Sequence, residues 1–178
     1  AMANKKKLKN ILPNKQKSWI AVYTKARHEK IVKEEFMKKG FETYLPLLRE
    51  RRKWSDRKKW VEFPMFRSYV FVRIYLNEIL PVLETPGVVR IISFGEKPAV
   101  INDKHISDIK LILNGGYKPQ NTDYFMRGDK VIVNQGPLKG IHGEIVRMDN
   151  HDRLILRINE IQNSISVKIE KQFLKILV

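Results

Sequence analysis

The chain has 178 residues and no cysteine, which excludes disulfide bonds, thiolate metal ligands and a cysteine nucleophile. No apolar run approaches the roughly 20 residues that a membrane-spanning helix needs. The N-terminus also has no apolar segment of the kind found in secretory signals. These absences favour a reducing cytoplasm and no membrane partner. The hydrophobic share of 43% is ample for a packed core, so the chain is expected to fold.

Acidic side chains are scarce in the first third of the chain. Residues 1–60 hold 19 Lys and Arg against 6 Asp and Glu, whereas residues 61–123 hold 7 of each and residues 124–178 hold 9 and 6. The net charge of +16 is therefore concentrated in one part of the sequence. A concentrated basic patch favours a polyanionic partner, and nucleic acid is the first candidate. A solvated charged face without a partner is the alternative.

The densest part of this charge is the stretch RERRKWSDRKKW, residues 49–60. Strand-like segments lie on both sides of Ser55-Asp56, which predicts a hairpin turn. Trp54 and Trp60 are interleaved with the cations, and exposed rings of this kind can stack on bases. For Trp60, packing across the hairpin is the favoured role. We predict phosphate contacts from the basic residues of the stretch, namely Arg49, Arg51, Arg52, Lys53, Arg57, Lys58 and Lys59.

The segment NGGYKPQNTD, residues 114–123, has the composition of a linker and no hydrophobic period. The hydrophobic patterns before and after it differ, which indicates a domain boundary. The predicted organisation is a basic N-terminal tail (1–17), a first domain (18–114), a linker (115–123) and a second domain (124–178).

The order of elements before the linker indicates an α+β domain with an antiparallel sheet and helices against it. The strands at 18–24 and 68–74 carry aromatic residues on one side and aliphatic residues on the other, so both faces need cover. The aromatic face is either a second packed face or a partner surface. Further strands are predicted at 42–54, 58–63 and 88–94, and helices in 27–41 (with Gly40 as C-terminal cap), 77–84 and 102–113.

Five short strands with turn residues between them occupy the last 55 residues, and no helical period accompanies them. Ile165, Val167 and Ile169 alternate with polar residues, as the two faces of a strand require. This pattern predicts a small β-barrel of the SH3-like kind.

The stretch GDKVIVNQGPLKGIHGEI, residues 128–145, resembles the KOW motif, which ribosomal proteins and transcription elongation factors share. Glycines in such a motif allow tight turns and close strand approach, and a proline restricts one turn. The matching residues are Gly128, Gly136, Pro137, Leu138, Lys139, Gly140 and Gly143.

The segments WIAVYTKARHEKIV, FPMFRSYVFVRI and TPGVVRIISFGEKPAVI precede this motif in that order. Together they resemble the NGN domain of the NusG family of transcription elongation factors. The resemblance covers residues 18–178. The basic segment RKWSDRKKWVEFPMF is most similar to specialised members, the RfaH group and the UpxY-type antiterminators of capsular polysaccharide operons.

The resemblance implies a protein that lies across the RNA polymerase cleft, contacts the clamp helices of the largest subunit, and suppresses pausing and termination. It implies contact with nontemplate or upstream DNA, with nascent RNA as a further candidate. Lys25 matches a DNA-contact position, and Arg27, His28 and Lys30 are included as its neighbours. The residues at matching clamp-contact positions are Tyr23, Phe66, Tyr69, Phe71 and Phe94.

For the KOW domain the resemblance implies a ribosomal protein or Rho as partner. A KOW-containing RNA-binding or ribosome-associated protein is the alternative function. An enzyme is not favoured, because the carboxylates occur mostly in turns, caps and solvated helix faces. We therefore expect no catalytic residue, no metal and no other cofactor, in a cytoplasmic monomer. The four histidines also lack metal-ligand spacing: His28, His105, His142 and His151.

Overall fold

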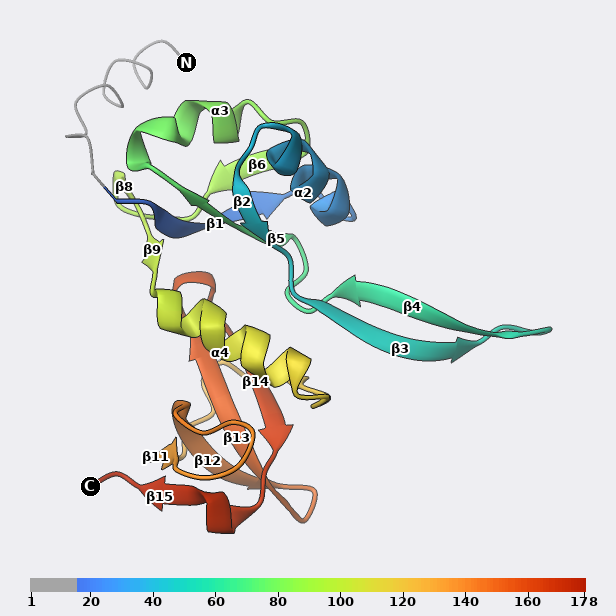
Figure 1. Cartoon of the computed structure of the whole chain (residues 1–178), viewed down its shortest axis with the longest axis vertical. Coiled ribbons are helices and arrows are strands. Elements are labelled where there is room, and N and C mark those ends of the chain that lie inside the picture. The colour runs from blue at the N-terminus through green and yellow to red at the C-terminus, as the bar shows by residue number, and fades with distance from the viewer. Residues whose placement is uncertain (1–15) are drawn as a thin grey trace. The chain divides into compact units, whose positions relative to one another are not determined.

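The computed structural model of the chain describes residues 16–178, and their α+β class is as predicted (Figure 1). The predicted basic tail, residues 1–17, lies almost wholly outside the described residues. The described chain divides into two compact units. One contains the residues up to 47 together with 66–103, and the other contains 48–65 together with 104–178. The predicted division at the linker stays a prediction.

The first unit is built on an antiparallel sheet with strand order β2-β5-β1-β6, to which β9 is added by pairing with β1. A separate two-stranded ladder joins β7 to β8. The elements are β1 (Ser18–Thr24), α2 (Glu29–Lys38), β2 (Glu42–Tyr44), β5 (Tyr69–Ile74), η2 (Leu76–Glu78), α3 (Ile79–Leu83), β6 (Val88–Ile91), β7 (Ser93–Phe94), β8 (Lys97–Pro98) and β9 (Val100–Ile101).

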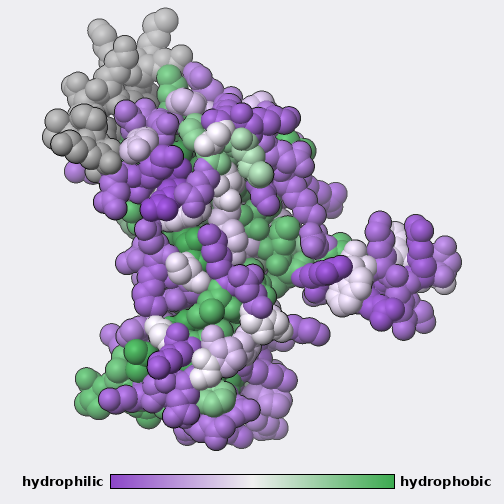
Figure 2. Space-filling view, viewed as in Figure 1, coloured by the Kyte–Doolittle hydropathy of each residue, from purple (hydrophilic) through white to green (hydrophobic). Residues whose placement is uncertain are grey.

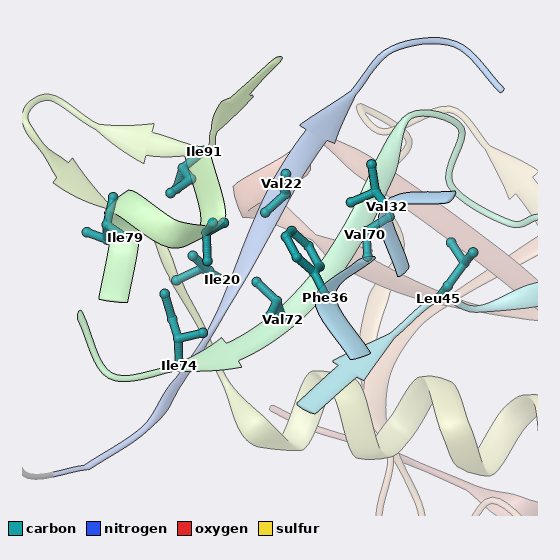
Figure 3. Packing of buried hydrophobic residues seen from close by; sticks show 11 residues of the cluster. Ile20, Val22, Val32, Phe36, Leu45, Val70, Val72, Ile74, Ile79 and Ile91 are labelled. Atoms are coloured by element: carbon teal, nitrogen blue, oxygen red, sulfur yellow. The ribbon is translucent and has the colours of Figure 1, made fainter. Parts of the chain in front are cut away.

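One face of this sheet is aliphatic and lies under helices α2 and α3 (Figure 3). Ile20 and Val22 of β1 lie beside Val70 and Val72 of β5, and the Phe36 ring of α2 points onto them. All five of these side chains are fully buried. Burial of each such side chain contributes roughly 1.5–3 kcal/mol, so this cluster is the main stabilising element of the first unit.

Helix α2 ends at a left-handed glycine, as predicted. Gly40 has a φ of +78°, and its N–H donates to the carbonyl of Met37 at 3.0 Å. The N–H of Phe41 donates to the carbonyl of Phe36, also at 3.0 Å, and the two rings meet edge to face. This pair of hydrogen bonds with its apolar contact is the Schellman arrangement, and it directs the chain from α2 into β2.

The second unit contains a six-stranded sheet with the order β10-β14-β13-β12-β11-β15, and a separate hairpin, β3-β4. All five strands predicted for the C-terminal region are present. The elements are β3 (Leu47–Lys53), β4 (Lys58–Pro64), α4 (Asp103–Asn114), β10 (Gln120–Thr122), β11 (Asp129–Val133), β12 (His142–Met148), β13 (His151–Ile158), η3 (Asn159–Ile161), β14 (Asn163–Lys168), η4 (Lys171–Phe173) and β15 (Leu174–Ile176).

Part of the predicted linker is a strand, which corrects the sequence-based expectation. Residues 120–122 form β10 and pair with β14, and the Thr122 hydroxyl donates to Ser166 Oγ at 2.8 Å. Linker composition describes side chains, whereas a strand ladder is made by backbone groups that every residue except proline possesses. The polar composition of this segment therefore gave no indication that it pairs with β14.

Two predicted strands are each divided into two. The stretch 42–54 becomes β2 and β3 because Leu45-Pro46 interrupts it, and proline has no N–H to donate to a ladder. The stretch 88–94 becomes β6, which pairs with β1, and β7, which pairs with β8. In both places the chain leaves the central sheet.

Two motif glycines lie where strands of the second unit approach closely. A Cβ on Gly128 would lie 2.1 Å from the Ile145 carbonyl oxygen, and one on Gly143 would lie 2.4 Å from that of Ile155. The Gly128 N–H donates to Glu144 Oε1 at 3.1 Å, and Glu144 Oε2 accepts a hydrogen bond from Arg157 at 2.5 Å. Burial alone raises the pKa of Glu144, but Arg157 and the Gly128 N–H hold this pKa below its usual range.

Replacing Gly128 by alanine is therefore expected to destabilise the protein by about 2–4 kcal/mol, because backbone atoms must move to admit the methyl group. Gly140→Ala is the matched control. Gly140 has a φ of +97°, but nothing lies within 4 Å of the place that its methyl group would take, so about 1 kcal/mol of backbone strain is expected. Urea unfolding followed by circular dichroism measures both. Equal losses would contradict the close-approach explanation.

Candidate functional site

Three side chains form a row across the face of the first sheet that is opposite the aliphatic cluster. Tyr23 of β1 pairs with Tyr69 of β5 on one side and with Arg90 of β6 on the other. The two tyrosine rings meet edge to face with centroids 5.5 Å apart, and the Arg90 guanidinium carbon lies 5.2 Å from the Tyr23 centroid. We call Tyr69, Tyr23 and Arg90 the aromatic row.

The next position along the same face is closed. Phe71 pairs with Ala21 and with Tyr44, stacks on the Tyr44 ring with centroids 6.5 Å apart, and meets the Phe66 ring edge to face at 6.2 Å. Phe66 and Phe71 are buried, whereas both tyrosines of the aromatic row are half-buried. A partner could therefore contact this face at the aromatic row, whereas the neighbouring position at Phe71 is closed by side-chain packing.

The five predicted clamp-contact residues are thus not equivalent. Tyr23 and Tyr69 lie in the row, and Phe94 is 66% exposed in the β7-β8 ladder, where it pairs with Lys97. Phe66 and Phe71 are core residues in the arrangement described, so neither offers a contact surface there. Their part in binding a partner stays a prediction.

Two tyrosines of this face, Tyr44 and Tyr69, have raised pKa values. Burial raises the pKa of Tyr44 to about 12. Burial also raises the pKa of Tyr69, and the cation of Arg90 opposes that rise. Both phenols are therefore neutral at physiological pH. The effect on Tyr69 shows that the Arg90 charge acts on the tyrosine at the other end of the row.

Of the predicted DNA-contact residues of the first unit, Lys25, Arg27 and His28 lie in the turn between β1 and α2, and Lys30 lies in the first turn of α2. Arg27 has a φ of +63°, which bends the chain, and the His28 ring nitrogen Nδ1 lies 2.9 Å from the Ala26 carbonyl oxygen. The turn is joined to the segment before Tyr69, because the buried Glu29 carboxylate accepts the Ser68 N–H at 2.8 Å. The side chains that remain exposed are Lys25, Arg27 and Lys30.

The basic stretch forms the predicted hairpin, with β3 and β4 joined through Trp54, whose N–H donates to the Arg57 carbonyl at 2.7 Å (Figure 1). Every residue from 49 to 60 is exposed, and hydrophilic residues cover almost all of the hairpin in Figure 2. The packing predicted for Trp60 is present as a stack with Arg49, although the ring is still 54% exposed. The hairpin charge is therefore available to a partner.

The two faces of this hairpin differ in charge. The Arg49 guanidinium carbon lies 4.9 Å from the Trp60 centroid, which places the two side chains on one face. Because alternate residues of a strand share a face, Arg51, Lys53, Lys58 and one acid, Glu62, belong to it too. We call it the cationic face, defined by Arg49, Arg51, Lys53, Lys58, Trp60 and Glu62.

The opposite face is mixed. Arg52 lies over the Phe63 ring at 5.5 Å and forms an ion pair with Glu50 at 3.8 Å. By the same alternation Lys59 and the half-buried Val61 belong to this face. One of its two strand cations is thus engaged with a carboxylate, so the seven predicted phosphate contacts are not equivalent.

The KOW-like residues build the second unit more than they expose a surface. Leu138 is 1% exposed, and the Gly140 N–H donates to the Val133 carbonyl at 2.8 Å, closing the loop that contains Pro137. Gly128 and Gly143 lie at the strand crossings described above. Exposed members of the motif are Gly136, Pro137 and Lys139.

Neither a metal centre nor a membrane-spanning helix is found in residues 16–178. No three His, Asp or Glu side chains come together there in a way that would hold a metal ion. None of the helices in that range has the length and apolar content needed to cross a bilayer. The aromatic row and the cationic face are both accessible and suited to binding.

A family model described as transcription termination factor NusG matches residues 17–110, just over half of the chain. The solved structure on domain interaction in Thermotoga maritima NusG has a TM-score of 0.54 at 22% identity, covering 92% of this chain and 98% of that one. The MjSpt4:Spt5 complex in conformation A has a TM-score of 0.32 at 19% identity, covering 89% and 97%. The first structure indicates a shared fold, and the lower score of the second supports no conclusion.

The raised pKa of Tyr44 predicts how stability depends on pH near this site. The unfolded chain releases the phenol proton near pH 10, before the folded protein does, so the free energy of unfolding falls as pH rises from about 10 to 12. After allowance for partial exposure, wild type should lose about 0.5 kcal/mol relative to Tyr44→Phe between pH 8 and pH 10.5. Urea unfolding of both proteins at the two pH values measures this. Parallel losses would contradict it.

Proposed function

The chain belongs to the NusG family, and from this premise we propose that it is a transcription elongation factor that binds RNA polymerase. The proposed contact is between the aromatic row and the clamp helices of the polymerase largest subunit. Binding there would hold the clamp closed and so suppress pausing and termination, because a ligand shifts an equilibrium toward the state that it binds better.

The observation that carries this proposal is the reachable row of Tyr69, Tyr23 and Arg90 on a face otherwise packed. Tyrosine and arginine are enriched among the residues that contribute most to protein–protein binding. Phe94 adds an exposed ring from the same unit. Phe66 and Phe71 would join the contact only if their cover were removed, so the proposal rests on the row and Phe94.

We further propose that the hairpin and the β1-α2 turn bind nontemplate or upstream DNA, with nascent RNA as a second ligand. On the hairpin, the cationic face is the proposed phosphate-binding side, since four of its six members are cations and one is an acid. Lys25, Arg27 and Lys30 extend the basic surface of the first unit. Phosphate contacts of this kind position a protein on DNA without reading sequence.

The finer assignments rest on the resemblance of the sequence. We propose a specialised member of the RfaH and UpxY kind, acting as a cytoplasmic monomer in antitermination of a polysaccharide operon. The six-stranded sheet of the second unit is proposed to be a KOW domain with an SH3-like barrel, bound by a ribosomal protein or Rho. The alternative is a KOW-containing RNA-binding or ribosome-associated protein, which would bind ribosomes in preference to polymerase.

Tyr69→Ala is expected to weaken binding to core RNA polymerase about tenfold or more, because it removes the ring at one end of the row. Binding is measured with the full chain and purified core enzyme, and circular dichroism checks the fold. Tyr75→Ala is the control: Tyr75 is an exposed tyrosine just past the other end of β5. If a folded Tyr69→Ala variant binds polymerase like wild type, the row is not the polymerase contact.

A matched pair of double variants tests the cationic face. Arg51→Gln with Lys53→Gln removes one arginine and one lysine from that face, and Arg52→Gln with Lys59→Gln removes the same two types from the other. If two phosphate contacts are lost, the slope of log affinity against log salt should flatten by about 2 for the first pair. The second pair should change it by less than about 0.5. Equal changes in DNA binding would contradict the assignment of faces.

A further inference from the structure

The aromatic row ends in a cation whose hydrogen-bonding capacity is not used within the described chain. Arg90 is exposed, and among residues 16–178 no acceptor lies within hydrogen-bond or ion-pair distance of its guanidinium. The guanidinium instead lies over the Tyr23 ring, 5.2 Å from its carbon to the ring centroid. A guanidinium carries five N–H donors, and an aromatic ring does not accept them as a carboxylate does.

The surroundings of Arg90 favour a protein partner over a phosphate. Val89 beside it is 51% exposed, Val88 is half-buried, and the other two members of the row are tyrosines. A phosphate-binding surface gathers several cations on one face, as the hairpin does, whereas the strand and ladder neighbours of Arg90 are valine, isoleucine and tyrosine, which is typical of a protein interface core.

The position of Arg90 makes it reachable. Strand β6 is the last strand in the order β2-β5-β1-β6, so a partner laid over the row meets Arg90 at the edge of the sheet. The antiparallel pairing of Arg90 with Tyr23, and of Tyr23 with Tyr69, holds the three side chains in register. The arginine is thereby held at a constant offset from the two rings.

We propose that Arg90 is a specificity-determining residue that donates two hydrogen bonds to an Asp or Glu carboxylate of the polymerase surface bound by Tyr23 and Tyr69. The inference rests on the proposed function and names the chemistry of the partner at this point. Arginine and a carboxylate match in a planar, two-bond geometry that lysine does not reproduce. The pair selects a partner surface that is acidic here and apolar opposite the two rings.

The test measures binding of full-length variants to core RNA polymerase at two salt concentrations. Arg90→Gln should weaken binding about tenfold and Arg90→Glu about a hundredfold. Arg90→Lys should weaken it by less than Arg90→Gln does, because lysine keeps the positive charge but lacks the planar pair of donors of the guanidinium. Wild-type affinity should also depend on salt more strongly than that of Arg90→Gln. Arg147→Glu is the control, because Arg147 is 67% exposed and belongs to the second unit.

The outcomes separate this inference from the proposed function. If Arg90→Glu binds within about twofold of wild type while Tyr69→Ala is weakened, the carboxylate contact is wrong and the polymerase contact stands. If neither variant is weakened, the polymerase contact itself fails. If Arg90→Glu loses affinity for duplex DNA but not for polymerase, Arg90 binds phosphate and the inference is overturned. A near-ultraviolet circular dichroism spectrum unchanged in Arg90→Gln shows that the Tyr23 environment has survived the substitution.

Discussion

The antiparallel register between β1 and β5 decides which side chains of the first unit are buried and which can meet a partner. With Tyr23 opposite Tyr69, the residues Ile20 and Val22 face α2 and α3, and the aromatic residues face the other way. Because side chains alternate along a strand, a slip of one residue would exchange the two sets. Packing of the aliphatic cluster under the helices therefore fixes the register between β1 and β5, and this register places the side chains of the aromatic row side by side.

The hairpin, unlike the sheet of the first unit, has no buried side chain between residues 49 and 60. These residues are all exposed, so the hairpin charge contributes little to folding and stays accessible to a partner. The Glu50–Arg52 pair is solvent-exposed, and such pairs contribute little stability. What the hairpin geometry does supply is a division of cations between two faces.

In the second unit, by contrast, Arg153 is buried, and Arg157 and Glu144 are half-buried. Arg153 is 4% exposed and donates from Nε to Ser166 Oγ at 2.9 Å and from its terminal nitrogen to the Ser166 carbonyl, also at 2.9 Å. Arg157 donates to the Glu144 carboxylate and to the backbone. A buried charge is tolerated where its hydrogen bonds are made, so these networks specify one arrangement of the strands.

Much of the fold could be predicted from residue patterns. The alternation in 18–24 and 68–74, the helical spacing before Gly40 and the turn at Ser55-Asp56 all correspond to elements at those places. These are local signals, in which neighbouring residues decide the backbone geometry. The strand at 120–122 was missed because its pairing is made by backbone atoms with a segment more than 40 residues away. No local composition reports such a partner.

The sequence by itself determined where the aromatic and basic residues occur, which family they resemble, and that they alternate along strands. Only the tertiary structure decided which of them a partner can reach. Tyr69 and Phe71 are two residues apart on the same face, yet Phe71 is enclosed by Tyr44 and Phe66 while Tyr69 stays half-open. Arg90 had no signal beyond being a charge within an aliphatic strand. Burial depends on packing between residues far apart in the sequence. The pairing of β6 with β1, and of β1 with β5, places Arg90 in one row with Tyr23 and Tyr69.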